Sequence, residues 1–162
     1  MTHSKTIIGV ISDTHGLLRP EVKKLFSGVN LILHAGDIGA PEVLEELKQW
    51  APVTAVRGNN DKGKWAERIP ETEVVQVGSA YLYMLHDVKE LDLNPTAADF
   101  QVVISGHSHK PSIDRRDGVL YLNPGSAGPR RFTLPVSVAR LTVEDSAVAG
   151  ELSIQGTLIE FA

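Results

Sequence analysis

Short apolar runs alternate with amphipathic segments in the first third of the chain. Residues 6–12 (TIIGVIS) and 30–37 (NLILHAGD) are mostly apolar, as is typical of strands buried on both faces of a sheet. Residues 20–28 begin with proline and end with glycine, and residues 40–50 place their apolar side chains on one face, which predicts two helices. A third strand is expected within 52–61, so the order of elements indicates a parallel sheet.

The second half of the chain has a different pattern, in which apolar and polar residues alternate. Two hairpins are expected, one around Gly78-Ser79 and one around Asp117-Gly118. A short helix is predicted at 93–100, because Asn94 can cap its first turn and a proline follows. Strands are predicted at 72–78, 80–86, 101–106, 112–123, 136–144 and 150–161, the last two antiparallel with one face in solvent.

The pattern shows no linker, internal repeat or low-complexity segment. We therefore predict one α/β domain over residues 1–162 with two sheets. A chain of 162 residues with 42% hydrophobic residues is long enough to bury a core of its own.

Composition and charge exclude several classes of function. The chain has no cysteine, which excludes disulfides, zinc–thiolate sites and thiol nucleophiles. A net charge of −4 and a pI near 5.8 argue against a duplex-DNA partner. No stretch approaches the roughly 20 apolar residues of a membrane span, and the start lacks the apolar region of a secretory signal. We expect a cytoplasmic protein without a membrane partner.

Side chains that can bind metal ions follow five of the expected strands. They are Asp13 and His15, Asp37, Asn59, His86, and His107 and His109. Ligands of open α/β sheets bind beyond the carboxyl ends of the strands, so these residues should meet at one edge. A nitrogen and oxygen set without thiolate suits Mn, Fe, Zn, Ni or Co better than calcium. Seven ligands are too many for one ion but suit two that share a carboxylate, roughly 3.5–4 Å apart.

The same residues form motifs that resemble those of the calcineurin-like metallophosphoesterases. The motifs are D-x-H at Asp13–His15, GD at Gly36–Asp37, GN-x-D at Gly58–Asp61, the single His86, and GH-x-H at Gly106–His109. The short chain and NPGS at Asn123–Ser126 resemble the small bacterial and archaeal phosphodiesterase branch, which shares its fold with the retromer subunit.

The resemblance implies a fold, a metal centre and a reaction. The fold is a two-sheet β-sandwich flanked by helices. The resemblance implies that Asp13, His15 and His109 hold one divalent ion, that Asn59, His86 and His107 hold a second, and that Asp37 bridges them. Manganese is the first expectation for both ions, with Fe, Zn, Ni or Co as alternatives. A hydroxide between the ions would attack the phosphorus of a small phosphate ester in line, so the implied enzyme is a metal-dependent phosphodiesterase.

The residues expected to meet the substrate include one departure from the family pattern. Many relatives have histidine after the motif asparagine, and the small branch often has cysteine, whereas this chain has Asn60. An asparagine can donate a hydrogen bond but cannot act as a general acid near neutral pH, which favours aryl leaving groups. We assign catalytic roles to Asn60 and Asp37, and substrate binding to Arg57, Asn60 and Arg130. Asp87 is a second departure, because relatives commonly have glycine after the histidine.

Several alternatives remain open. Asp13 and Asn59 are also common turn formers, Arg57 could hold its loop rather than meet phosphate, and Arg130 could be solvated. His34 is expected to orient a ligand or to pack. The enzyme could be a phosphomonoesterase or a nucleotide hydrolase. A non-catalytic scaffold like the retromer subunit is the other class, although that subunit has lost part of the ligand set and this chain keeps all seven candidates. Edge strands permit an oligomer but do not imply one.

Overall fold

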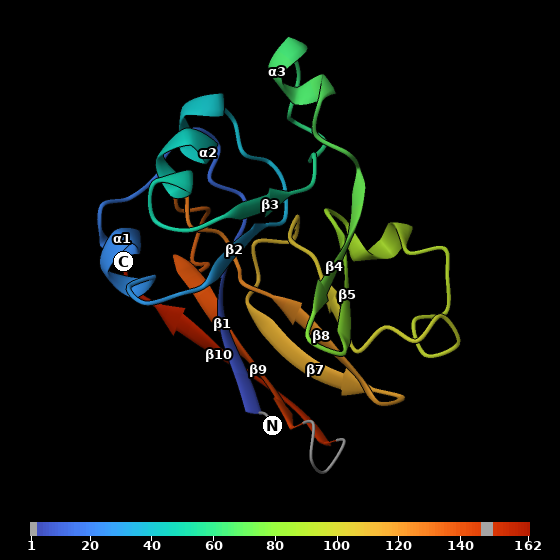
Figure 1. The fold of residues 1–162 in the computed structure, drawn as a ribbon. Coiled ribbons are helices and arrows are strands. Elements are labelled where there is room, and N and C mark those ends of the chain that lie inside the picture. Colours follow the sequence, from blue (N-terminus) through green and yellow to red (C-terminus); the bar gives the residue numbers. More distant parts are fainter. Residues whose placement is uncertain (1–2, 147–150) are drawn as a thin grey trace.

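The chain folds into two mixed five-stranded sheets that pack face to face (Figure 1). The computed structural model describes residues 3–146 and 151–162. Sheet A has the order β10 (Glu151–Glu160), β9 (Ser137–Ser146), β1 (His3–Ile11), β2 (Leu31–His34), β3 (Val53–Ala55). Sheet B has the order β4 (Thr72–Val77), β5 (Ala80–Leu85), β6 (Val102–Ile104), β8 (Val119–Asn123), β7 (Ser112–Arg116). The predicted two-sheet α/β sandwich is confirmed.

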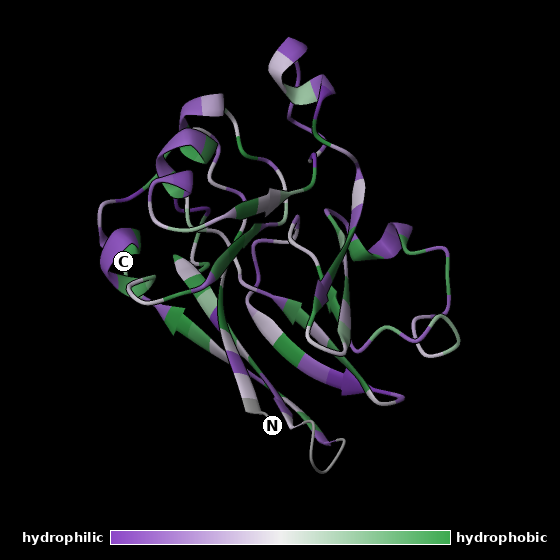
Figure 2. Ribbon diagram, viewed as in Figure 1, coloured by the Kyte–Doolittle hydropathy of each residue, from purple (hydrophilic) through white to green (hydrophobic). Residues whose placement is uncertain are grey.

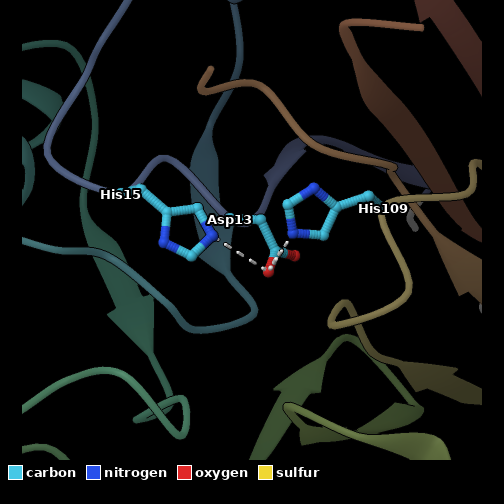
Figure 3. A group of neighbouring side chains, drawn as sticks. All are labelled: Asp13, His15 and His109. Carbon is cyan, nitrogen blue, oxygen red and sulfur yellow. Dashed lines mark ion pairs between the residues drawn. The ribbon is translucent and has the colours of Figure 1, made fainter. Parts of the chain in front are cut away.

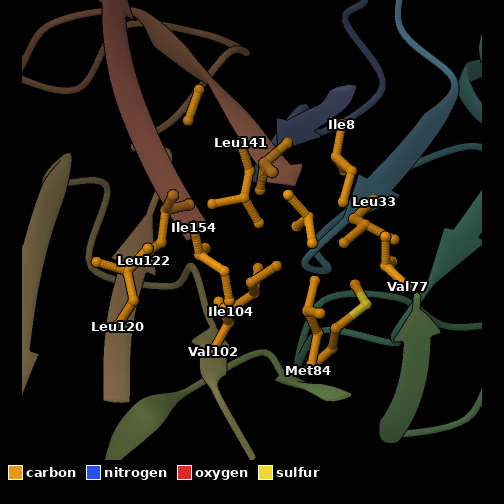
Figure 4. Close-up of a cluster of buried hydrophobic side chains, with 14 of the residues drawn as sticks. Ile8, Leu33, Val77, Met84, Val102, Ile104, Leu120, Leu122, Leu141 and Ile154 are labelled. Carbon is orange, nitrogen blue, oxygen red and sulfur yellow. The ribbon is translucent and has the colours of Figure 1, made fainter. Parts of the chain in front are cut away.

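The main core lies between the two sheets (Figure 4). Ile8 and Leu33 of sheet A pack against Met84, Ile104 and Leu122 of sheet B, and all five are nearly inaccessible to solvent. The apolar runs of the sequence are explained by burial on both faces, because consecutive side chains of a strand point to opposite sides. In β1, for example, Ile8 faces the inter-sheet core, whereas Ile11 joins the cluster on the other face.

The helices cover the outer face of sheet A. Helices α1 (Glu21–Leu25) and α2 (Pro41–Lys48) bury apolar residues such as Val22 and Leu47 against the sheet and keep polar residues outside (Figure 2). The outer face of sheet B is covered by the 3₁₀ helix η1 (Val88–Glu90) and the segment 91–100, where Phe100 packs on Tyr83. Among the described residues, no helix is long and apolar enough to cross a membrane.

Three expectations about individual elements were wrong or incomplete. Residues 93–100 form turns instead of a helix: Asn94 Oδ1 accepts from the backbone N–H groups of Thr96 and Ala97, but Asp99 has a φ of 63° and ends the segment. Helix α3 (Lys64–Glu67) was not expected, because four residues give no periodic pattern. Strand β1 begins at His3, since its pairing with β9 extends that far. Position 150 of the predicted last strand lies outside the described residues.

The parallel strands bring one set of loops together. Strands β1, β2 and β3 run parallel in sheet A, and β5, β6 and β8 run parallel in sheet B. Their carboxyl-terminal loops are joined by backbone hydrogen bonds, from Asp13 N to Gly36 O at 2.9 Å and from Gly106 N to His86 O at 2.9 Å. His86 Nδ1 donates to Ala35 O at 2.7 Å and so connects the two sheets. The loops therefore form one edge built from both sheets.

Candidate metal centre

Most of the predicted ligands have a left-handed backbone conformation. The φ angles are 55° for Asp13, 48° for His15, 55° for Asp37, 70° for His107 and 63° for His109. A residue other than glycine adopts this region at a cost of about 1–3 kcal/mol, and such residues concentrate at functional sites. Backbone hydrogen bonds hold the conformation, including His15 N to Asp37 O at 2.9 Å. Five of the seven residues for which metal binding was predicted therefore have a strained backbone conformation.

One group of ligand atoms is formed by Asp13, His15 and His109 (Figure 3). His109 Nε2 lies 3.3 Å from Asp13 Oδ1, and His15 Nε2 lies 3.8 Å from the same oxygen. The two imidazoles approach Asp13 from opposite sides, and their ring centroids are 5.5 Å apart. These are the three residues that the family resemblance assigned to the first ion.

A second group is formed by Asp13, Asp37 and His86. His86 Nε2 lies 3.3 Å from Asp37 Oδ2 and 3.8 Å from Asp13 Oδ1. His15 Nε2 lies 3.8 Å from Asp37 Oδ2, so the Asp37 carboxylate sits between an imidazole of each group. Asp13 belongs to both groups. The two groups therefore adjoin, as two neighbouring ions would require.

The donor atoms fit divalent cations. Within the described part of the chain, the buried atoms Asp13 Oδ1, His15 Nε2, His86 Nε2 and His109 Nδ1 have no hydrogen-bond partner. An unsatisfied buried polar group costs about 1–3 kcal/mol. Asp13 Oδ1, His15 Nε2 and His86 Nε2 converge, and their convergence needs a compensating ligand. Because His86 Nδ1 donates to a carbonyl, its Nε2 is the atom left to face Asp13 and Asp37. Carboxylate and imidazole donors without thiolate are typical of first-row transition metal sites.

The negative charge of the two carboxylates in the second group also favours binding of a cation. Burial disfavours the imidazolium form of His86, but the contact of its Nε2 with Asp37 Oδ2 at 3.3 Å and the attraction of the Asp13 carboxylate outweigh burial and raise the pKa of His86 to about 9. Burial likewise acts to raise the pKa of Asp37, yet the close contact with His86 and the hydrogen bonds from Asn60 lower it to about 2. In the metal-free protein, one proton on His86 thus compensates two carboxylates, and a metal ion would replace that proton.

Asn59 and His107 lie at the side of these groups. The His107 side chain is 45% exposed, with its Nε2 3.7 Å from Asp87 Oδ2 and its ring centroid 5.2 Å from that of His86. Asn59 is exposed. Both residues line a cavity of about 580 Å³ that His86 also borders. Binding of the second ion by Asn59 and His107 stays a prediction, as do the other ligand assignments.

The three residues predicted to meet substrate occupy different positions. Asn60 donates twice to Asp37, from its backbone N to Oδ1 at 2.9 Å and from Nδ2 to Oδ2 at 3.1 Å. Arg57 lines the same cavity as Asn59 and forms an ion pair with Glu71 at 3.1 Å.

Arg130 borders a second cavity, on the side of His15 and His109. Its guanidinium donates to the carbonyl oxygens of Leu134 and Ala162.

Several residues that hold the ligands were not assigned this role from the sequence. Ser12 Oγ donates to Asp13 Oδ2 at 2.6 Å, and Ser126 Oγ donates to the Asp13 carbonyl at 3.0 Å. Asn123 Nδ2 donates to Gly106 O at 2.9 Å and to Ser108 Oγ at 3.1 Å, and so holds the loop between His107 and His109. The available signal was the NPGS motif, which begins at Asn123 and ends at Ser126.

His34 connects the loops that present Asp13 and Asp37. Its Nδ1 accepts from Gly36 N at 3.1 Å, so its Nε2 carries the proton and donates to Thr14 Oγ1 at 3.0 Å. Thr14 Oγ1 in turn donates to Ile38 O at 2.8 Å. His34 is completely buried, and burial lowers its pKa to about 4 despite the attraction of Asp13. The sequence prediction that His34 packs or orients a ligand is consistent with this position.

The depressed pKa of His34 predicts a loss of stability in acid. Between pH 6.5 and 4 the unfolded chain binds a proton at this residue and the folded protein does not, so stability falls as the pH falls. The expected loss from His34 is about 3 kcal/mol, since each pH unit corresponds to about 1.36 kcal/mol. Urea unfolding of metal-stripped protein across this range should show a steeper decline for the wild type than for His34→Gln. Equal slopes would contradict the assignment of a neutral, buried imidazole.

Comparison with known proteins identifies the class to which this fold and site belong. Residues 7–146 match the family model of the calcineurin-like phosphoesterase superfamily domain, and the chain belongs to this superfamily. Within it, the chain belongs to the branch of small archaeal and bacterial metallophosphoesterases. The family resemblance recognised in the sequence is confirmed.

Three relatives illustrate the similarity. A protein of Methanocaldococcus jannaschii, named as a probable metallophosphoesterase, is 37% identical over 162 aligned residues, covering 92% of this chain and 82% of the relative. A phosphodiesterase of the same organism is 29% identical and covers 73% of this chain and 82% of its own length. The crystal structure of Vps29 from Entamoeba histolytica, complexed with Zn²⁺, has a TM-score of 0.70 at 25% identity and covers 94% of this chain and 99% of that one.

Proposed function

We propose that the protein is a two-metal phosphodiesterase that hydrolyses a small phosphate ester. The observation that supports this most is the convergence of buried, unpartnered carboxylate and imidazole atoms in two adjoining groups that share Asp13. Two ions at the distance that such adjoining groups allow form the arrangement used for in-line displacement at phosphorus. The phosphodiesterase from Methanocaldococcus jannaschii is a relative with the proposed activity.

In the proposed enzyme, Asp13, His15 and His109 hold one ion, and Asn59, His86 and His107 hold the other. Asp37 lies between the two imidazoles that would belong to different ions, which suits it to bind both. Two bound divalent ions would supply Lewis acidity toward the phosphate and a water that ionises near neutral pH. Manganese is our first candidate, and zinc is a further one, since Zn²⁺ is bound by the related Vps29 structure.

The protein's own residues position the reacting groups. The two hydrogen bonds from Asn60 fix both oxygens of Asp37, so Asn60 acts on the centre through that carboxylate as well as through any contact with phosphate. Asn60 cannot protonate a leaving group, and we propose that esters with good leaving groups are cleaved fastest. Arg57 lies two residues before Asn59 and lines the same cavity, and we propose that it meets the phosphate by exchanging its pairing with Glu71.

The test is hydrolysis of bis-p-nitrophenyl phosphate and p-nitrophenyl phosphate by protein stripped of metal and reloaded with Mn²⁺. Diester cleavage should appear only after reloading and should vanish in Asp37→Asn. Faster cleavage of the monoester would instead indicate a phosphomonoesterase. If two ions bind per chain and neither compound is cleaved, the scaffold alternative replaces this proposal.

A further inference from the structure

The cavity beside His86 has an acidic wall. Its volume is about 580 Å³, large enough to receive one arm of an ester. His86 and His107 border it on the side of the metal centre. The charged residues that line the rest are Glu71, Asp87, Glu90, Asp92 and Arg57. Four carboxylates thus face a single guanidinium, which already forms an ion pair with Glu71 at 3.1 Å.

Local structure explains how the acidic residues come to this wall and remain accessible. Asp87 Oδ1 accepts from Lys89 N at 3.1 Å and caps η1, so the helix begins directly after β5 and holds Glu90 at the cavity. Glu90 and Asp92 are exposed, and in the described part of the chain their carboxylates have no hydrogen-bond or ion-pair partner. Their charge is therefore available to a ligand.

A second observation shows that the cavity adjoins a ligand site. The His86 side chain, which is only 6% exposed and has an Nε2 without a hydrogen-bond partner among the described residues, lines this cavity as well as the metal centre. Tyr83 also lines the cavity and is held in place by Phe100, with ring centroids 5.2 Å apart. An aromatic ring together with carboxylates is the combination that binds quaternary ammonium groups.

A second cavity beside the metal centre is lined by the opposite charge. A cavity of about 380 Å³ lies beside His15 and His109, and the residues that complete its lining are Pro129, Arg130, Arg131 and Phe132. Two arginines and no carboxylate line it, and the Phe132 side chain is 90% exposed with a φ of 53°. A phosphodiester bound at the ions would therefore have one arm near carboxylates and the other near arginines and an aromatic ring.

We propose that the acidic cavity is a subsite for a positively charged alkylammonium arm of the substrate. This inference rests on the proposed phosphodiesterase function. The anionic phosphate would bind at the metal ions, and a cation separated from the ester oxygen by two carbon atoms would lie among Asp87, Glu90 and Asp92. Polyanionic substrates such as nucleoside triphosphates are disfavoured, because extra phosphates on this side would meet the same carboxylates.

A pair of substrates isolates the charge of this arm. p-Nitrophenyl phosphorylcholine and p-nitrophenyl 3,3-dimethylbutyl phosphate have the same shape and leaving group. They differ at one atom, which is the ammonium nitrogen in the choline ester and a neutral carbon in the other compound. In both, water attacks phosphorus, the bond from phosphorus to the aryl oxygen breaks, and p-nitrophenolate departs, leaving phosphorylcholine or its neutral-arm analogue. For the Mn²⁺-loaded wild type we expect kcat/KM to be about tenfold higher for the choline ester, through a lower KM.

Matched variants assign the preference to the cavity. The double variant Glu90→Gln/Asp92→Asn should lower the ratio of the two kcat/KM values to about twofold. The control Glu45→Gln/Glu46→Gln removes the same charge from exposed positions of α2 and should leave the ratio at its wild-type value. Calorimetric titration with phosphorylcholine and 3,3-dimethylbutyl phosphate should show the same preference in binding.

The outcomes separate this inference from the function on which it rests. Absence of metal-dependent hydrolysis of bis-p-nitrophenyl phosphate overturns the proposed function itself. If that compound is hydrolysed normally but the wild type shows no preference for the choline ester, only the subsite is overturned. The same holds if the preference exists but the cavity variant does not change it. If a p-nitrophenyl glycerol phosphate is preferred over the choline ester, the proposal of a cationic arm is wrong, and the cavity binds a polyol, which carboxylates also bind.

Discussion

Replacing Asp13 with asparagine is expected to lower metal-dependent diester hydrolysis by more than about 100-fold. Mutation of residues that only support metal ligands costs up to about 100-fold, and loss of a ligand itself should cost more. Asp13 Oδ2 accepts from Ser12 Oγ at 2.6 Å and from His107 N at 3.0 Å, and an asparagine oxygen can keep both bonds. The amide nitrogen would then replace Oδ1, which faces His15, His86 and His109. A neutral donor at this position cannot bind a cation, so both adjoining groups lose their shared ligand.

The measurement for Asp13→Asn combines turnover of bis-p-nitrophenyl phosphate with the number of manganese ions bound per chain. Circular dichroism should show an intact fold, since the hydrogen bonds to Ser12 and His107 remain. Asp114→Asn is the matched control, because Asp114 lies on β7, is largely exposed and pairs only with Arg116 among the described residues. Retention of two ions and of activity in Asp13→Asn would falsify the role of Asp13 in both groups.

The strand-end argument predicted correctly that Asp13, Asp37, His86 and His109 lie close together, because the topology determines where strand ends meet. Parallel strands place their carboxyl ends on one edge, and Asp13, Asp37, His86 and His109 follow four such strand ends. The two-sheet fold could be predicted equally well, since buried strands and hairpin turns leave clear patterns in the sequence. Asp61, the last residue of the GN-x-D motif, braces the Asn59 loop, because its carboxylate accepts from Gly58 N and Gly39 N.

The sequence could not reveal how each side chain points. Five predicted ligands have a positive φ, a property that depends on hydrogen bonds between loops far apart in the chain. The exposed position of Asn59 and the approach of His107 to Asp87 depend on the same loop contacts. The acidic cavity was also not foreseen, because its carboxylates come from separate segments and Glu90 reaches the wall only through η1. Long-range geometry of this kind leaves no periodic signal.

The second large effect is expected for Gly106→Ala, through sterics at the junction of the two sheets. A Cβ at this position would overlap Ser12 Oγ and lie 2.7 Å from Asp13 Oδ2. Neither neighbour can move freely, because Ser12 and Asp13 are completely buried. Overpacking of this kind costs about 1–3 kcal/mol. Displacement of Asp13 should also weaken manganese binding and reduce diester hydrolysis by about 100-fold, as for other changes that misplace a ligand.

Gly118→Ala provides the control that separates stability from site geometry. Gly118 has a φ of 79°, so alanine there is strained by about 1 kcal/mol, but its Cβ would meet no atom within 4 Å. We expect both variants to unfold at lower urea concentration, and only Gly106→Ala to lose metal affinity and turnover at temperatures where it remains folded. Equal activities of the two folded variants would show that Asp13 tolerates displacement. The narrow fit at Gly106 would then reflect packing of the sheets alone.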